Sequence, residues 1–191
     1  MRKLVLLMMV SLAAMAIGAA TVLASHGADD NAQASCTAPT AGAAEHGSGT
    51  SGDDNLGGSS SDDNEHGGRG NDHISGHDGN DDLNGDQGDD DICGDRGNDH
   101  LNGGAGDDRL DGGAGNDVEN GQSGNDRVNG QSGADKLSGG SGNDTVNGGS
   151  GKDTINVRDG RRDHVNCGSG NDTVKADHKD VVSHNCEHVH R

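Results

Sequence analysis

The chain contains no phenylalanine, tyrosine or tryptophan, and its 191 residues include only one proline, Pro39. Basic residues are also scarce, because 14 Lys and Arg stand against 33 Asp and Glu and give a formal net charge of −19. The missing aromatic side chains leave little apolar surface for a core. The acidic balance argues against nucleic acid as a partner, because the phosphate backbone would be repelled.

Motifs of common enzyme classes are missing as well. No serine stands in a nucleophile elbow, and no glycine-rich loop carries the lysine of a P-loop. Acidic residues are frequent, but their regular spacing indicates ligands rather than an acid and a base tuned apart in one pocket. We therefore expect no enzymatic activity.

Glycine, in contrast, is abundant and recurs with a fixed period. From Gly49 to Asn156 the chain repeats every nine residues, twelve times, without insertion or deletion. Position 1 is Gly in every unit, position 4 is Gly except at Ser61, and position 6 is always Asp. Position 8 is Leu, Ile or Val in ten units, with Glu65 and Glu119 as the exceptions. An Asp fixed every nine residues beside paired glycines is a metal-binding pattern.

Each repeat unit also predicts its own local structure. The apolar residue at position 8 has polar neighbours, as Ile74 has His73 and Ser75, which indicates a minimal strand with one inward side chain. Glycines at positions 1 and 4 permit positive φ or close backbone approach. Asn or Asp at position 5 tolerates a left-handed conformation.

Two nonads are expected to make one coil, so alternate units stack on opposite sides and their aspartates form two columns. The first predicted column contains Asp54, Asp72, Asp90, Asp108, Asp126 and Asp144. The second predicted column contains Asp63, Asp81, Asp99, Asp117, Asp135 and Asp153.

Stacked carboxylates need a cation. Coils about 4.8 Å apart would bring the aspartates into mutual repulsion, and no basic residue recurs to neutralise them. Ca²⁺ accepts six to eight oxygen ligands, whereas zinc, copper and iron fit poorly because the loops contain no Cys and, apart from His77, no His. A disordered Gly/Asp/Asn-rich linker is the alternative that composition favours. The strict phase of the apolar residues argues against it.

The consensus Gly-Gly-x-Gly-x-Asp-x-U-x, with U apolar, resembles the calcium-binding nonapeptide of RTX (haemolysin-type) proteins. The resemblance covers residues 49–175. It implies an all-β fold, a parallel β-roll in which a six-residue calcium-binding turn precedes a three-residue strand. The implied cofactor is Ca²⁺, and the implied ligands are the two aspartate columns together with Asp172. One aliphatic side chain per nonad stabilises less than ordering nine residues costs, so the metal-free chain is expected to be largely unfolded.

Four segments are predicted along the chain: a signal peptide at 1–24, a disordered linker at 25–48, the roll at 49–175 and a C-terminal cap at 176–191. Arg2 and Lys3 precede an apolar run from Leu4 to Ala20 and a small-residue cleavage site ending at Ala24, which indicates a secretory signal. An uncleaved membrane anchor is the alternative. We expect a secreted, extracellular protein without membrane contact after cleavage.

The rhythm of the repeat changes near the C-terminus. The segment from Val157 to Asn166 is one residue too long for the frame, and Cys167 restarts the nonad. An atypical last unit is the usual cap of a solenoid. The tail also contains four histidines, which we interpret as solvated side chains rather than a zinc or copper site: His178, His184, His188 and His190.

Four cysteines in an exported chain indicate disulfides, for which three pairings are possible. Cys167 and Cys186 bracket the cap and form the preferred pair. Cys93, at a position 9 that is expected to face outward, is within reach of Cys36 on the linker. Four free thiols are the alternative.

The two glutamates at the inward position 8 predict local irregularity, because a buried carboxylate is costly. A one-residue shift would bury Val118 and expose Glu119. No apolar neighbour can replace Glu65. Unit 58–66 is therefore expected to be an ill-ordered edge, with the firm roll starting at Gly67.

These features predict a secreted protein that folds on binding calcium and acts as an extracellular calcium buffer or scaffold. A different class is a calcium-dependent adhesion module that docks on cell-surface polysaccharide or on another copy of itself. A third hypothesis is an accessory to a separately encoded secreted hydrolase.

Overall fold

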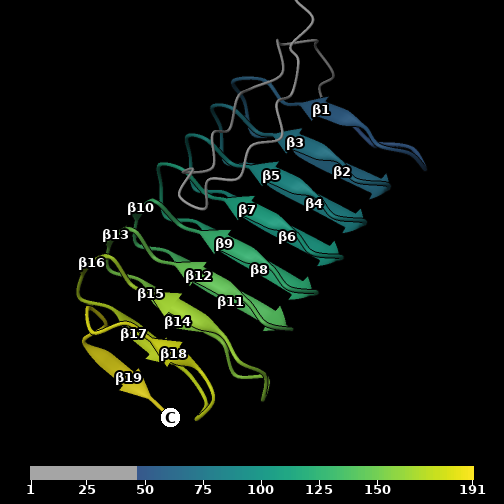
Figure 1. The fold of residues 1–191 in the computed structure, drawn as a ribbon. Helices are drawn as coiled ribbons and strands as arrows, with labels where there is room; N and C mark the ends of the chain where they lie inside the picture. Colours follow the sequence, from purple (N-terminus) through teal and green to yellow (C-terminus); the bar gives the residue numbers. More distant parts are fainter. Residues whose placement is uncertain (1–46) are drawn as a thin grey trace, which may run out of the picture. The chain divides into compact units, whose positions relative to one another are not determined.

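The computed structural model describes residues 47–191, and these form a roll of stacked coils without any helix among them (Figure 1). All strand pairs are parallel, and paired residues such as Leu83 and Leu101 lie 18 positions apart. One coil therefore contains two nonads. The predicted all-β parallel β-roll is confirmed.

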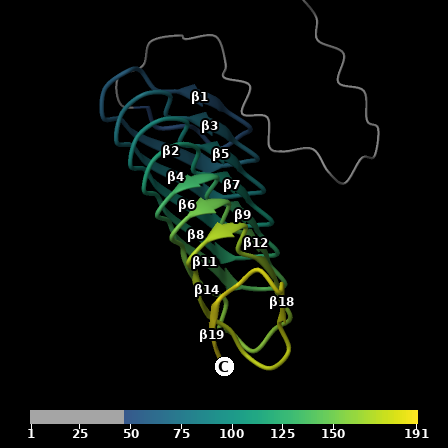
Figure 2. The ribbon, with the colours of Figure 1, turned by 90° about the vertical axis from the view of Figure 1, so that its left-hand side faces the viewer.

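Two eight-stranded sheets lie along the coils (Figure 2), and a third sheet, labelled β10, β13 and β16 in Figure 1, has three strands. The first contains β1 (Asn55–Gly57), β3 (His73–Ser75), β5 (Asp91–Cys93), β7 (Arg109–Asp111), β9 (Arg127–Asn129), β12 (Thr145–Asn147), β15 (His164–Asn166) and β18 (Val181–Val182). The second contains β2 (Asn64–Arg69), β4 (Asp82–Gln87), β6 (His100–Ala105), β8 (Val118–Ser123), β11 (Lys136–Ser141), β14 (Thr154–Asn156), β17 (Thr173–Lys175) and β19 (His188–His190). The third contains β10 (Ser132–Gly133), β13 (Ser150–Gly151) and β16 (Ser169–Gly170).

The core consists of the single apolar side chain that each nonad contributes from position 8. Alternate strands belong to the first and second sheets, so the core side chains come from both. Nine of them are at most 2% exposed: Ile74, Leu83, Ile92, Leu101, Leu110, Val128, Leu137, Val146 and Ile155. They form two separate clusters, one ending at Leu101 and Leu110 and the other beginning at Val128 and Leu137. The unit that contains Glu119 lies between the two clusters.

The predicted shift of register at Glu119 is wrong. Glu119 pairs in the regular register with Leu101 on β6 and Leu137 on β11. Its side chain is 1% exposed, whereas Val118 is 37% exposed. β8 makes a ladder of five residue pairs with each neighbour, so it cannot slip by one residue without breaking hydrogen bonds on both sides.

The expectation of an ill-ordered edge at unit 58–66 is also wrong. β2 pairs with β4 in regular register, and Glu65 lies opposite Leu83 with only 1% of its surface exposed. On its other side, Ser48 forms a bridge with His66, whose main-chain N–H donates to the Gly47 carbonyl at 3.1 Å. β2 is thus paired on both sides, and ordered structure begins before Gly67.

Left-handed backbone occurs at positions 2 and 4 rather than at position 5. Gly115, at position 4, has φ of 157°, and a methyl group there would overlap the Gly97 carbonyl oxygen. At position 2 five non-glycine residues have φ between 61° and 74°: His77, Asp86, Asp95, Gln122 and Gln131. Asn and Asp at position 5 instead form a ladder between coils, as the Asn116 main-chain N–H donates to Asn98 Oδ1 at 2.9 Å.

The extra residue of the 157–166 segment is absorbed in an exposed turn, 158–162. Val157, Asp163 and Val165 therefore stay buried in the positions that the repeat requires. The frame continues through the cap, where β18 and β19 pair with β15 and β17. The four tail histidines are exposed, in agreement with their interpretation as solvated side chains.

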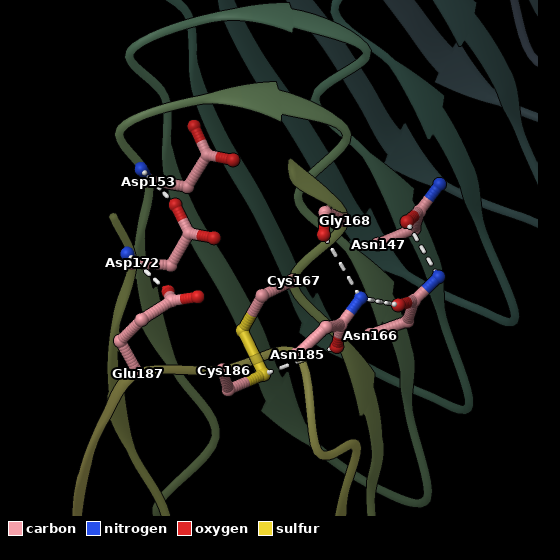
Figure 3. Close-up of a disulfide and its surroundings, with 9 residues drawn as sticks. All are labelled: Asn147, Asp153, Asn166, Cys167, Gly168, Asp172, Asn185, Cys186 and Glu187. Carbon is pink, nitrogen blue, oxygen red and sulfur yellow. Dashed lines mark hydrogen bonds between the residues drawn. A yellow bond between two sulfur atoms is a disulfide. The ribbon is translucent and has the colours of Figure 1, made fainter. Parts of the chain in front are cut away.

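Cys167 and Cys186 form a disulfide, which confirms the preferred pair (Figure 3). Their Cα atoms are 5.3 Å apart, because the two residues occupy corresponding places in successive coils. Asn166 and Asn185 directly precede the two cysteines. The Asn185 side-chain amide donates to Asn166 Oδ1 at 2.7 Å, and this hydrogen bond aligns the two segments.

Cys93 is disulfide-bonded as well. Its side chain follows the inward Ile92 on β5 and therefore points to the outer face of the sheet, as expected, yet it is only 1% exposed. Cys36 lies outside the described residues, as do the predicted signal peptide and most of the predicted linker. Within residues 47–191 we found no helix long and apolar enough to cross a membrane.

Candidate metal site

The position-6 aspartates lie in two columns, in the order that the repeat predicts. The main-chain N–H of each aspartate donates to Oδ1 of the aspartate one coil further along. For the pair Asp108 and Asp126 the N–O distance is 2.9 Å, and across the twelve repeats it stays between 2.8 and 3.0 Å. Each carboxylate thus holds two neighbouring coils together through one of its oxygens.

Three acidic residues that sequence analysis missed continue these columns into the cap. The main-chain N–H of Asp144 donates to Asp163 Oδ1 at 2.8 Å, and the main-chain N–H of Asp163 donates in turn to Asp180 Oδ1 at 3.2 Å. In the other column the main-chain N–H of Asp172 donates to Glu187 Oε2 at 2.9 Å (Figure 3). Both columns therefore end on an acidic side chain of the cap.

The second carboxylate oxygen, Oδ2, is left open along most of each column. Twelve Oδ2 atoms are buried without a hydrogen-bond partner in the described part of the chain: those of Asp72, Asp81, Asp90, Asp99, Asp108, Asp117, Asp126, Asp135, Asp144, Asp153, Asp163 and Asp172. The first two aspartates differ. Asp54 Oδ2 accepts from the Thr50 N–H at 2.5 Å, and Asp63 Oδ2 accepts from the Ser59 N–H at 2.6 Å. The open oxygens thus begin at Asp72.

The open oxygens face the α-carbons of the position-1 glycines. A methyl group on Gly94 would lie 2.5 Å from Asp99 Oδ2 and 2.6 Å from the Gly112 carbonyl oxygen. Carboxylate and carbonyl oxygens therefore converge on a space that only the missing side chain keeps open. In the last coils Val157, Cys167 and Ala176 occupy the corresponding position and are buried in the apolar cluster. There, packing and the disulfide replace the open space.

The pKa values show that groups of the protein do not fully compensate the negative charge of the buried carboxylates. Burial, supported by the neighbouring carboxylates, raises the pKa of the ten column aspartates from Asp81 to Asp163, and the main-chain hydrogen bond to each one opposes the effect without cancelling it. The pKa is raised to about 6 for Asp81, Asp90 and Asp108, and to about 7 for Asp99, Asp126, Asp135 and Asp163. Ionisation of these buried side chains near neutral pH therefore opposes folding unless a cation compensates the charge.

The donor set fits a hard cation. Within residues 47–191 no three acidic, His or Cys side chains gather into a metal-binding cluster, so a bound ion must also take main-chain oxygens. Ca²⁺ accepts such mixed carboxylate and carbonyl shells of six to eight oxygens. Zinc and copper prefer nitrogen and sulfur, and among the loops of the twelve repeats only His77 offers such a side chain.

The raised pKa values predict an unusual pH dependence for the metal-free protein. A carboxyl group whose pKa is higher in the folded state stabilises that state below its unfolded pKa, and this contribution is lost as pH rises through the folded value. The ordinary value of 3.8 and the raised values of 6 to 7 define the window. In chelator, acidification from about pH 8 to about pH 5 should therefore increase β-structure, as measured by circular dichroism.

The midpoint of that transition identifies the groups responsible. A midpoint near pH 4, the ordinary value for a carboxyl group, would not identify the buried columns as the groups responsible. A midpoint between about 6 and 7 would assign the change to the buried columns. A loss of β-structure on acidification would contradict the prediction.

Comparison with known proteins agrees with this geometry. A family model described as the RTX calcium-binding nonapeptide repeat (4 copies) matches residues 57–92, 91–119 and 120–155. Together these segments span just over half of the chain. They include every position-6 aspartate from Asp63 to Asp153, but neither Asp163 nor Asp172. No curated protein matches the sequence.

Proposed function

The chain belongs to the family of RTX calcium-binding nonapeptide-repeat proteins, and from this premise we propose that it is a secreted protein that folds on binding calcium and serves as an extracellular calcium buffer or scaffold. The twelve buried Oδ2 atoms without a protein partner carry the proposal. They supply carboxylate ligands at regular intervals along both columns, which suits binding of many ions per chain. The proposal assigns no catalytic activity to the protein.

Calcium titration calorimetry on the purified chain tests this proposal. We expect several Ca²⁺ ions to bind per molecule, in the high-micromolar to millimolar range that is typical of extracellular calcium modules. Mg²⁺ is the matched control, because it demands a small octahedral shell and gives up its water reluctantly. A chain that takes up no calcium, or that responds equally to both ions, would contradict the proposal.

A calcium-dependent adhesion module is the second candidate, and the outer faces of the roll favour it. Amide side chains form rows there, as Asn102 donates to Asn84 at 3.0 Å and Asn147 donates to Asn129 at 2.9 Å. Such repeating polar rows are suited to a polymer of regular spacing, such as a polysaccharide. Co-sedimentation with cell-wall polysaccharide, with and without calcium, separates this candidate from a free buffer.

A further inference from the structure

Glu119 interrupts the apolar column of the second sheet. Its side chain is 1% exposed and lies between Leu101 and Leu137. All the remaining coils from Leu83 to Ile155 place an aliphatic residue at this position. Neither Oε1 nor Oε2 has a hydrogen-bond partner. An uncompensated carboxylate in such a place is strongly destabilising, so its burial requires a partner of opposite charge or a proton.

The glutamate is directed toward a loop of the calcium-binding type. A methyl group on Gly112 would lie 2.6 Å from Glu119 Oε1 and 2.6 Å from Asp117 Oδ2. Two open carboxylate oxygens therefore face the same small space in front of the Gly112 α-carbon. In the preceding loop of this column, one carboxylate oxygen and one carbonyl oxygen face the corresponding space at Gly94.

The surroundings of Glu119 increase its need for a cation. The charged groups that act on it are Asp117, Asp111 and Asp135, and all of them are acidic. No ion pair within residues 47–191 includes it. The main-chain N–H of Asn129 acts favourably on the carboxylate but does not reach hydrogen-bond geometry.

Several of the neighbouring carboxylate oxygens are already engaged. Asp117 Oδ1 accepts from the Asp99 main-chain N–H at 2.9 Å, which leaves Oδ2 as its open atom. Asp111, itself 1% exposed, accepts from Asn129 at 3.3 Å and from Gln131. Glu119 Oε1 and Asp117 Oδ2 are the open side-chain oxygens that lie nearest the Gly112 α-carbon.

We propose that Glu119 is a direct calcium ligand of the loop from Gly112 to Asp117, and that two carboxylates make this loop the tightest cation site of the roll. The inference rests on the proposed function, because it takes calcium as the ion that the loops bind. Affinity of calcium sites is tuned by the number of charged ligands. A second carboxylate at one loop therefore distinguishes it from the single-carboxylate loops above and below.

Two variants test the assignment, with a matched control. Glu119→Leu restores the aliphatic column, and Glu119→Gln keeps the size of the side chain without its charge. In calcium titration calorimetry the wild type should show one class of site that fills first. Both variants should weaken that class by about tenfold or more, as expected for the loss of one charged ligand. Glu65→Leu, the same change at the other position-8 glutamate, should leave it unchanged, because Glu65 Oε2 faces Gly47 rather than a loop aspartate.

The direction of the effect decides the outcome. If Glu119 were only a buried acid, leucine would remove a destabilising charge, and the variant would bind calcium as tightly as the wild type or more tightly. That result would overturn the inference while leaving the proposed function intact. Absence of calcium binding by the wild type would overturn the proposed function itself. Circular dichroism in saturating calcium verifies that each variant is folded, and Glu119→Gln decides the question if the leucine variant does not fold.

Discussion

Removal of calcium with a chelator is expected to convert the roll from β-structure into a largely unfolded chain. Each nonad buries one aliphatic side chain, which stabilises the roll less than ordering nine residues destabilises it. Burial of the aspartate columns adds a further penalty, because twelve Oδ2 atoms have no protein partner and lie in line with carboxylates of the same charge. Far-UV circular dichroism in chelator should therefore show coil, and calcium titrated back should restore β-structure.

The transition should be steep in calcium concentration. Each coil contacts only its neighbours, so folding propagates from one coil to the next, and an ion that orders one loop prepares the adjoining loops. Sodium chloride at matched ionic strength is the control for general screening of the net charge. Salt screens exposed charges but has little effect on buried ones. A chain that folds fully in chelator, or in sodium chloride alone, would show that calcium is not the source of the missing stability.

The period of the sequence was sufficient to predict the architecture. Glycine, aspartate and one aliphatic residue in strict phase gave the parallel roll, the two-nonad coil and the order of both aspartate columns. The reason is that each unit has few structural options: the glycine at position 4 requires positive φ, and the residue at position 8 has only one inward direction. The preferred disulfide followed as well, because Cys167 and Cys186 bracket the cap.

What the period could not predict depends on contacts between coils. Residue preference predicts a left-handed backbone at position 5, but Asn98 and its counterparts instead bond the next coil through their side chains. The glutamate at 119 was expected to turn outward on the cost of its burial alone. The ladders on both sides of β8 outweigh that cost and keep the side chain inside.

Asp163 shows which signal was overlooked. The inserted residue shifts Asp163 by one position from the nine-residue period that is counted from the position-1 glycines. The period therefore does not predict Asp163 as a ligand. Its distance to the next inward residue is nevertheless regular, because Val165 follows it by two positions as Ile155 follows Asp153. Spacing to the following apolar residue identifies column members better than spacing to the preceding glycine, since the insertion falls in the turn and leaves the strand unchanged.

Substitution of an aspartate in the middle of a column is expected to have a far larger effect than substitution at its first coil. Asp126 is 1% exposed, its N–H donates to Asp144 Oδ1 at 2.9 Å, and its own Oδ1 accepts from the Asp108 N–H at 2.9 Å. Alanine at this position leaves the Asp108 N–H buried and unpaired, which costs about 1–3 kcal/mol. It also removes an open Oδ2 from a loop with coils on either side.

Asp54 lacks these features. It is only partly buried, and its Oδ2 accepts hydrogen bonds from the Thr50 N–H at 2.5 Å and from the Thr50 hydroxyl at 2.9 Å. Alanine there removes partly exposed hydrogen bonds at the first coil, with an expected loss of about 1 kcal/mol or less. In calcium titrations followed by circular dichroism, Asp126→Ala should therefore shift the midpoint to clearly higher calcium, whereas Asp54→Ala should stay close to the wild type.

Asp126→Asn separates the two contributions at the mid-column position. The asparagine Oδ1 can still accept from the Asp108 N–H, but an amide group replaces Oδ2 and the negative charge is lost. If the open oxygen binds calcium, this variant should retain a large part of the shift that alanine causes. If the column acts only through its hydrogen bonds, asparagine should behave like the wild type. Equal effects of Asp126→Ala and Asp54→Ala would mean that position along the column does not matter, which is incompatible with coils that share their ligands.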